Sequence, residues 1–230
     1  MGLREEQQGQ RRQRILAAAK RLIREGGAEA LVMRELARRA EVSLATPYNL
    51  FAGKADILHA LLIESVEQTE ARQAALKELT PFAWCFAVLD CAADQYTQDA
   101  AYGRALMRAL WEQPDPTLTP KVWQRSISGM AELFRRAQAA GELGDEIDPD
   151  LLAYQQFFDF LIALEGWTFG YLDDAGFRAQ FRYGLALSIN AACSEEGRCK
   201  ARDLLLACQS DLAEALEARR KDGLRHGGEA

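Results

Sequence analysis

The chain has 230 residues, of which 49% are hydrophobic and 27% are charged, and its formal net charge is −6. These proportions are typical of a protein that buries a sizeable core in one or two domains, and they exclude a disordered or fibrous chain. The apolar run from Phe157 to Leu164 is interrupted by Asp159 and is too short to span a bilayer, so we expect no membrane partner.

The N-terminus and the cysteines indicate the cellular compartment. The first twenty residues are polar and arginine-rich, so the sequence predicts no signal peptide. The five cysteines include no C-x-x-C pair, and an odd number cannot pair off completely in disulfides. This usage suits a reducing cytosol, and we predict a cytoplasmic protein whose cysteines are buried small hydrophobes, with redox sensing as the alternative.

Charge is distributed unevenly along the chain. Residues 1–54 carry 11 Lys and Arg and 6 Asp and Glu, a balance of +5, whereas residues 55–230 carry 17 and 28, a balance of −11. A basic N-terminal segment before an acidic remainder predicts that any contact with a polyanion is confined to that segment. A chance fluctuation in charge is the alternative.

The hydrophobic pattern predicts helices from end to end. The first is indicated by a buried stripe with the i, i+3, i+4, i+7, i+8 spacing, formed by Ile15, Ala18, Ala19, Leu22 and Ile23. Gly26 and Gly27 end it, one of them in the left-handed conformation. Further helices are predicted at about 33–40, 44–50, 54–76, 80–98, 101–112, 119–140, 149–170, 175–192 and 200–221. No alternating strand pattern is visible, so the predicted fold class is all-α.

Residues 33–51 have the size of a DNA-reading helix-turn-helix. The second of its helices is about ten ångströms long and fits a major groove roughly 12 Å wide. Ser43 is placed as the N-cap of that helix, which leaves the first-turn N–H groups facing a phosphate. Pro47 falls in the first turn, where it removes at most one intrahelical hydrogen bond.

Five residues in and just after this segment match the spacing V-S-x-x-x-x-Y-x-x-F-x-x-K, namely Val42, Ser43, Tyr48, Phe51 and Lys54. A helix that begins Ile15-Leu-Ala-Ala-Ala precedes them. In these features the sequence resembles the TetR-type transcriptional regulators. The resemblance implies an N-terminal three-helix DNA-binding domain over residues 1–54 and a larger helical effector-binding and dimerisation domain over residues 55–230.

The resemblance also implies a role for single residues. Those that would contact phosphates are Ser43, Thr46, Tyr48 and Lys54. Those that would face base edges are Leu44, Ala45 and Asn49. The first two of these offer apolar contact, for example with a thymine methyl group, and Asn49 can bond adenine. For Tyr48 the alternative is a core aromatic, and for Lys54 a solvated residue at a helix start.

The sequence departs from the family pattern at three positions. Val32 stands where a capping threonine is usual, Pro47 where an aliphatic residue is usual, and Leu50 where a polar residue is usual. The first helix of the motif is therefore predicted to be poorly capped. Upstream, an arginine cluster is predicted either to form an N-terminal arm on DNA or to be a solvated face: Arg11, Arg12 and Arg14.

Residues 55–230 are rich in large side chains, and the resemblance implies an effector pocket between the middle helices. Its predicted lining is Trp84, Met107, Trp111, Trp123 and Phe134, with core packing as the alternative for each. Polar groups that would orient a ligand, or else lie on solvated faces, are Arg104, Arg108 and Gln124. The resemblance places a homodimer interface on the helices at 149–170 and 175–192. The helix at 200–221 is expected to pack, or to extend that interface, through Leu205, Cys208, Leu212 and Leu216.

Signs of catalysis are few. His59 and His226 lie too far apart for a metal motif or a triad, and no phosphate-binding glycine loop is present. The acidic residues between Glu142 and Asp150 resemble a solvated loop with a helix N-cap more than paired catalytic carboxylates. We therefore predict no enzyme activity, no cofactor and no metal.

Together these observations predict a homodimeric, ligand-responsive, DNA-binding transcriptional regulator, a repressor rather than an activator. It would bind a palindromic operator in double-stranded DNA and be released by a small, largely apolar or aromatic effector. One alternative is a DNA-binding regulator that a partner protein controls. The other is a helical small-molecule carrier or enzyme in which the DNA-binding domain is a relic.

Overall fold

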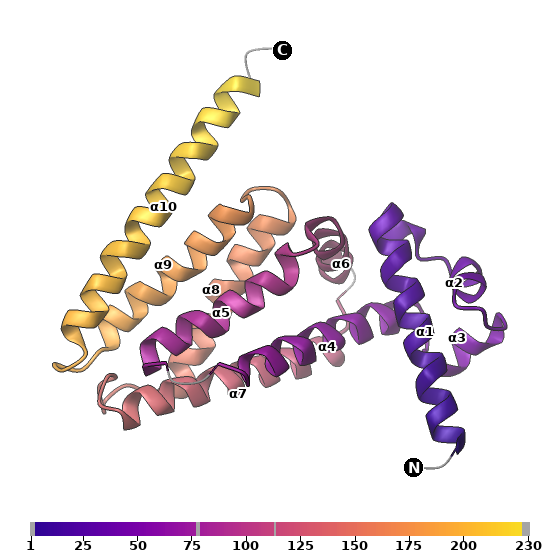
Figure 1. The fold of residues 1–230 in the computed structure, drawn as a ribbon, viewed down its shortest axis with the longest axis horizontal. Helices are drawn as coiled ribbons and strands as arrows, with labels where there is room; N and C mark the ends of the chain where they lie inside the picture. Colours follow the sequence, from indigo (N-terminus) through magenta and orange to yellow (C-terminus); the bar gives the residue numbers. More distant parts are fainter. Residues whose placement is uncertain (1–2, 77–78, 113, 227–230) are drawn as a thin grey trace. The chain divides into compact units, whose positions relative to one another are not determined.

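The computed structural model describes residues 3–76, 79–112 and 114–226, and in these ranges all regular secondary structure is helical. One isolated bridge pairs Leu143 with Cys193. The helices are α1 (Leu3–Gly26), the short 3-10 helix η1 (Ala28–Ala30), α2 (Met33–Arg39), α3 (Ala45–Leu50), α4 (Lys54–Gln73), α5 (Pro81–Thr97), α6 (Ala100–Glu112), α7 (Leu118–Ala139), α8 (Pro149–Thr168), α9 (Asp174–Ala192) and α10 (Arg198–His226) (Figure 1). The all-α prediction is confirmed. None of the described helices is both long and apolar enough to cross a membrane.

The chain forms two compact units, and the first comprises residues 1–71 and 95–122. Its core is the predicted stripe of α1, in which all five residues are at most 2% exposed. α1 packs against η1, α2 and α6. Two contacts fix α6 to α1: Arg24 Nε donates to Asp99 Oδ2 at 2.5 Å, and Lys20 Nζ lies 5.2 Å from the ring centroid of Tyr102. α1 is thus the element against which η1, α2 and α6 pack in the first unit.

The predicted glycine stop after α1 takes an unexpected form. Gly27 has φ 68° and ψ −171°, an extended positive-φ conformation that is open to glycine rather than the left-handed helical one. It leads into η1, which the hydrophobic pattern does not predict because three residues are too few to show a period.

The second unit comprises residues 72–94 and 123–230, and its centre is aromatic. The ring of Trp167 stacks on that of Phe177 at a centroid distance of 5.7 Å, while Phe160 and Phe181 surround Phe177 at 5.6 and 5.4 Å. α9 packs against both α8 and α10. The predicted division at residue 54 stays a prediction, because the compact units are defined by packing and not by function.

α10 packs on α9 through the first half of its predicted stripe only. Leu205 and Cys208 are buried, whereas Leu212 is half-buried and Leu216 is 51% exposed. The expected packing of this face is therefore seen at Leu205 and Cys208, while Leu216 is open in the single chain. Spacing along a helix shows which residues share a face, but not how far a neighbouring helix covers it.

The connection between α7 and α8 differs in part from the predicted solvated loop. Asp148 caps α8 as expected, because its carboxylate accepts hydrogen bonds from the backbone N–H groups of Asp150 and Leu151. Glu142, in contrast, is only 7% exposed. Its carboxylate accepts from the Phe82 N–H at 3.0 Å and from Lys200 Nζ at 3.1 Å, so it ties the connection to α5 and α10.

The histidine His59 and two of the five cysteines are buried. His59 is 1% exposed, and its ring nitrogens lie 2.9 Å from the Ala55 carbonyl oxygen and 3.2 Å from Thr119 Oγ1, so its polar atoms are satisfied. The side chain of His226 lies outside the described residues. All five cysteines are free. Burial raises the pKa of the Cys85 thiol to about 12, while Cys199 is exposed and departs from the expectation of burial.

Candidate nucleic-acid interface

The helix-turn-helix consists of α2 and α3 joined by residues 40–44. Glu41 in the turn has φ 54°, a left-handed conformation that reverses the chain within a few residues. α3 has six residues and is therefore about 9 Å long. This size lets the whole helix enter a major groove.

The start of α3 differs from the predicted serine cap. The N-cap position is Leu44, without a side-chain hydrogen bond, and Ser43 lies one residue earlier. Ser43 Oγ is instead 2.8 Å from Thr46 Oγ1, and its backbone carbonyl accepts from the Thr46 N–H at 2.9 Å. The prediction that the Ser43 side chain caps the helix is wrong, since the two hydroxyls pair with each other. Val32 precedes α2 without a side-chain cap, as expected.

The residues assigned to DNA contact lie largely on the surface. Leu44 and Tyr48 are 52% and 54% exposed, and Ala45 and Asn49 are exposed as well. Pro47 on the opposite side of α3 is buried. The core-aromatic alternative for Tyr48 is therefore wrong. α3 presents one open face that bears apolar, hydroxyl and amide groups, which is a set suited to base edges and phosphates.

Lys54 is less open than the residues of α3. Its side chain is 29% exposed, and Nζ lies 3.8 Å from Glu29 Oε1, whose side chain is 94% exposed. A pair at this separation on the surface contributes little to stability. The ammonium group can therefore exchange this carboxylate for a phosphate at small cost.

Two arginines of α2 are held by carboxylates. Arg38 Nη2 donates to Glu35 at 2.6 Å, and Arg39 Nε donates to the same carboxylate at 2.8 Å. These hydrogen bonds lower the pKa of Glu35 to about 2. Arg39 also donates to Glu25 Oε2 at 2.5 Å. The positive charge of both arginines is thus compensated within the first unit.

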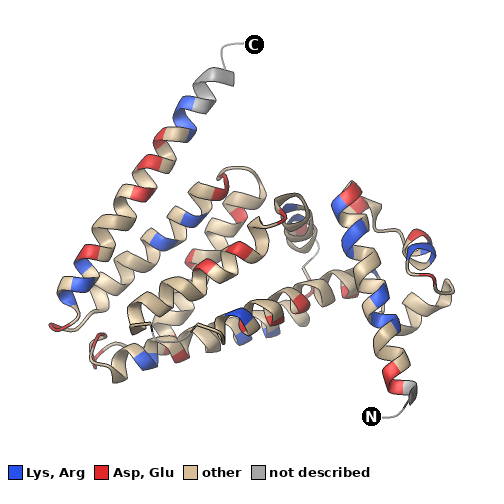
Figure 2. Cartoon of the chain, in the orientation of Figure 1, with Lys and Arg blue, Asp and Glu red and all other residues tan. Residues whose placement is uncertain are grey.

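The three arginines of the predicted cluster lie on α1. Figure 2 shows Lys and Arg at several positions along this helix. Arg12 stacks over the ring of Phe51 at 4.4 Å, whereas Arg11 and Arg14 are exposed and make no ion pair with any described residue. The three do not form an extended arm, because they are part of the regular helix α1.

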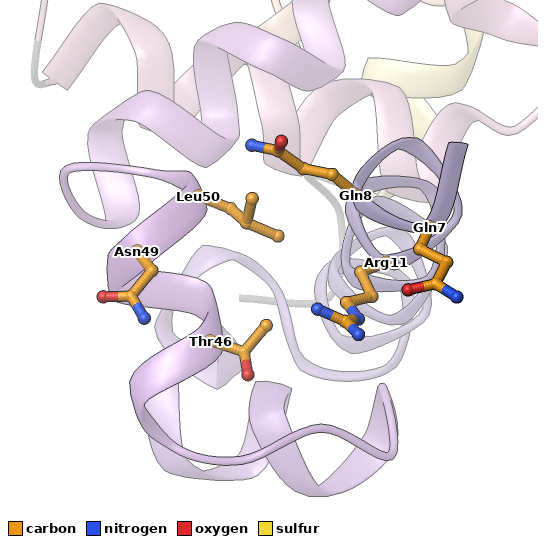
Figure 3. A pocket seen from close by; sticks show the side chains of 6 residues that line it. All are labelled: Gln7, Gln8, Arg11, Thr46, Asn49 and Leu50. Carbon is orange, nitrogen blue, oxygen red and sulfur yellow. The ribbon is translucent and has the colours of Figure 1, made fainter. Parts of the chain in front are cut away.

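A groove separates the N-terminal part of α1 from α3. Its lining is Gln7, Gln8 and Arg11 of α1 and Thr46, Asn49 and Leu50 of α3 (Figure 3). Gln7 and Gln8 are not among the sequence-based candidates, because the hydrophobic stripe of α1 starts only at Ile15. The acidic pair Glu5 and Glu6 in the first turn is the signal that could have placed the start of the helix earlier.

The five residues predicted to line an effector pocket are divided between the two units. Met107 is 6% exposed and Trp111 is half-buried in the first unit. In the second unit Phe134 is 1% exposed, and Trp84 and Trp123 are half-buried. That these side chains line one cavity stays a prediction.

Two tryptophans of the second unit have distinct surroundings. Trp123 makes an edge contact with Phe158 at a centroid distance of 5.5 Å. The guanidinium of Arg136 lies 4.4 Å from the ring of Trp84, and the Trp84 Nε1 atom is buried without a hydrogen-bond partner among the described residues. Of the polar candidates, Arg108 and Gln124 are exposed and Arg104 is half-buried.

Comparisons with known proteins agree with this arrangement. Residues 15–61 match the sequence model of the family described as "Bacterial regulatory proteins, tetR family". The HTH-type transcriptional repressor KstR of Mycolicibacterium smegmatis is 39% identical over 79 residues, which are 34% of this chain and 39% of the relative. KstR of Rhodococcus jostii is 40% identical over 65 residues, 28% of this chain and 31% of the relative. The chain thus matches less than half the length of these curated relatives.

Solved structures share the fold over most of the chain. SmeT, the repressor of the Stenotrophomonas maltophilia multidrug efflux pump SmeDEF, has a TM-score of 0.64 at 20% identity and covers 80% of this chain and 91% of its own. TylP, a TetR regulator from Streptomyces fradiae, has a TM-score of 0.62 at 18% identity and covers 89% and 98%. SmeT has also been solved in complex with triclosan, with a TM-score of 0.60 at 20% identity and coverage of 80% and 92%. At these identities the likeness concerns the fold alone.

Proposed function

We propose that this chain, whose residues 15–61 match the TetR family of bacterial regulatory proteins, is a DNA-binding transcriptional repressor of that family. Its operator is a palindrome in double-stranded DNA, to which the protein binds as a homodimer, and a small apolar or aromatic effector releases it. Because it acts on DNA, it works in the cytoplasm. It is a regulator and not an enzyme.

The observation that carries the proposal is the open face of α3. Leu44, Ala45 and Asn49 lie exposed together on a helix that is short enough to enter a major groove. We assign these three to base edges. Tyr48 and the hydroxyl pair of Ser43 and Thr46 flank them as phosphate contacts, and such contacts orient the helix without reading sequence.

Exposed apolar side chains on the second unit support the homodimer. On α8, Leu151, Tyr154 and Ile162 are 69%, 55% and 67% exposed, and on α9 Leu187 is 44% exposed. By their spacing the three residues of α8 share one face of that helix, and exposed apolar side chains on one face typically mark a contact with another protein. We assign this surface to a second copy of the chain. A palindromic operator has two half-sites with centres about 34–36 Å apart, and its symmetry matches a twofold axis in a protein dimer.

The effector is proposed on two grounds. Trp84, Trp123 and Phe134 supply aromatic surface in the second unit, and the buried Nε1 of Trp84 has no partner among the described residues, so it is available to a polar atom of a ligand. SmeT, which shares the fold, has been solved with triclosan. A ligand that favours another arrangement of the two DNA-binding domains of the dimer shifts the population away from the DNA-binding form. The coupling free energy between two such sites is typically about 1–3 kcal/mol.

Fluorescence anisotropy tests the proposal. The purified chain is titrated into the duplex that lies upstream of its own coding sequence and into a random duplex of equal length. We expect tighter binding to the former and a linear fall of log K with log salt for both. Absence of salt-sensitive binding to either duplex would favour the carrier or enzyme with a relic DNA-binding domain.

The Lys54→Ala variant tests one phosphate contact. It is expected to weaken binding to both duplexes equally and to reduce the salt slope by about one, because one ammonium no longer displaces a counterion. Lys121→Ala serves as the control, since Lys121 is exposed on α7 and outside the helix-turn-helix. An unchanged slope for Lys54→Ala would remove Lys54 from the phosphate contacts.

The Asn49→Ala variant tests base reading. We expect it to lose preference at a single base pair, at a cost of about 1–3 kcal/mol for the preferred base, because a bidentate amide contact is lost. The measurement is a competition series in which every position of the duplex is substituted in turn. If the base preferences match those of the wild type at all positions, sequence is read elsewhere.

A further inference from the structure

The groove between α1 and α3 has a definite place relative to the face assigned to base edges. On α3, Thr46 and Leu50 are four residues apart and line the groove, while Leu44 and Tyr48 lie on the other side of the helix. Asn49 also lines the groove, so it lies at the border between the groove and the face assigned to base edges. A helix with its side chains is about 10–12 Å across, and the major groove is about 12 Å wide. When α3 enters the major groove, each of its flanks therefore lies against a sugar–phosphate backbone.

The flank that carries Thr46 and Leu50 is the one that α1 faces. Figure 3 shows Arg11 and Gln8 pointing from α1 toward α3, with Thr46 and Leu50 on the opposite wall. A sugar–phosphate backbone of the DNA that runs along this side of α3 enters the groove between α1 and α3. The α1 wall lies before residue 15 and so outside the stretch that matches the family.

The side chains that line the groove are those of a phosphate-binding site. Arg11, Gln8, Thr46 and Asn49 all carry hydrogen-bond donors, and no acidic side chain lines the groove among the described residues. Arg11 is exposed and makes no ion pair with a described residue, whereas the guanidinium of Arg12, also exposed, lies over the ring of Phe51. A guanidinium without a carboxylate partner can donate two parallel hydrogen bonds to phosphate oxygens.

We propose that this groove receives a phosphodiester of the DNA backbone beside the major groove, with Arg11 as its charged ligand and Gln8 and Thr46 as neutral donors. The inference rests on the proposed function, because it needs α3 in the major groove. It gives the protein a phosphate contact from its N-terminal helix, in addition to those of the helix-turn-helix. The contact orients α3 and carries no base preference of its own.

The test compares Arg11→Ala with Arg21→Ala. Both side chains are exposed on α1, and ten residues of helix, about 15 Å, separate them, so the pair matches in charge change and helix propensity. Anisotropy is measured with the upstream duplex and the random duplex between about 50 and 200 mM salt. We expect Arg11→Ala to weaken binding to both duplexes about fivefold and to lower the salt slope by about 0.9, with Arg21→Ala near wild type.

A second pair of variants uses added charge instead of lost charge. Gln8→Glu places a carboxylate in the groove, and Gln13→Glu places one on the exposed surface of α1 outside it. Gln8→Glu should weaken binding to both duplexes about tenfold, because like charges oppose each other, and Gln13→Glu should have a smaller effect. Circular dichroism confirms that all four variants retain the helical content of the wild type.

The outcomes separate this inference from the proposed function. If the wild type binds neither duplex, the proposed function fails. If the wild type binds and Arg11→Ala equals Arg21→Ala, the groove assignment fails while the function stands. If Arg11→Ala loses affinity for the upstream duplex only, with an unchanged salt slope, the groove would contact bases and the proposed phosphate contact would be overturned. Thermal stabilisation of the free wild type by inorganic phosphate, absent in Arg11→Ala, would assign it to a free anion and overturn the DNA assignment.

Discussion

The Ala45→Glu variant is expected to lose DNA binding by about a hundredfold or more while it remains folded. Ala45 is exposed in the first turn of α3, on the face assigned to base edges. A carboxylate there approaches the electronegative floor and phosphates of the major groove, and a like-charge juxtaposition of this kind costs several kcal/mol. Folding is unaffected, because an acidic residue in the first turn of a helix is favourable.

The matched control for this variant is Ala207→Glu. Ala207 is an exposed residue of α10 in the second unit, so the same change in charge is made away from the helix-turn-helix. Anisotropy with the upstream duplex should give near wild-type affinity for Ala207→Glu. If both variants lost the same DNA affinity, net charge would govern binding and α3 would not enter the major groove.

The Gly197→Ala variant is expected to lower the free energy of unfolding by about 2–3 kcal/mol. A Cβ atom at Gly197 would lie 2.4 Å from the carbonyl oxygen of Glu142, a backbone atom that cannot turn aside. The same carbonyl accepts a hydrogen bond from the Ser194 N–H at 3.0 Å. The start of α10 must therefore move away from the α7–α8 connection, which also strains the pair of Glu142 and Lys200.

Chemical denaturation followed by circular dichroism measures this effect, with Gly129→Ala as the control. Gly129 lies inside α7, and a Cβ atom there meets nothing within 4 Å. The same glycine-to-alanine change should stabilise the protein by roughly 0.5–1 kcal/mol, because alanine loses less conformational entropy in a helix. A stabilised Gly197→Ala variant would show that α10 does not approach the connection closely.

Much of this arrangement could be predicted because it is local in sequence. The stripe of α1 follows from the spacing of five apolar residues, and all five are buried. The start of α8 follows from Asp148, whose carboxylate caps it as expected. The motif from Val42 to Lys54 fixes where the recognition helix lies, and the exposure of Tyr48 agrees with its assigned role.

The features that could not be predicted depend on residues far apart in the chain. Glu142 looks like a loop acid by its neighbours, yet it is buried because Phe82 and Lys200, sixty and fifty-eight residues away, supply its hydrogen bonds. The hydroxyl of Ser43 had two possible partners within three residues, and only the backbone geometry decides between them. The groove of Arg11 and Thr46 needs the packing of two helices, which spacing along one helix cannot show.

Hydroxyl-radical footprinting of the wild type and of Ala45→Glu on the upstream DNA tests the central claim, that α3 of two copies enters adjacent major grooves. The account predicts two symmetric protected half-sites with centres about 34–36 Å apart, or a multiple of this, for the wild type and none for Ala45→Glu. A single unpaired footprint, or protection that Ala45→Glu leaves intact, would contradict it.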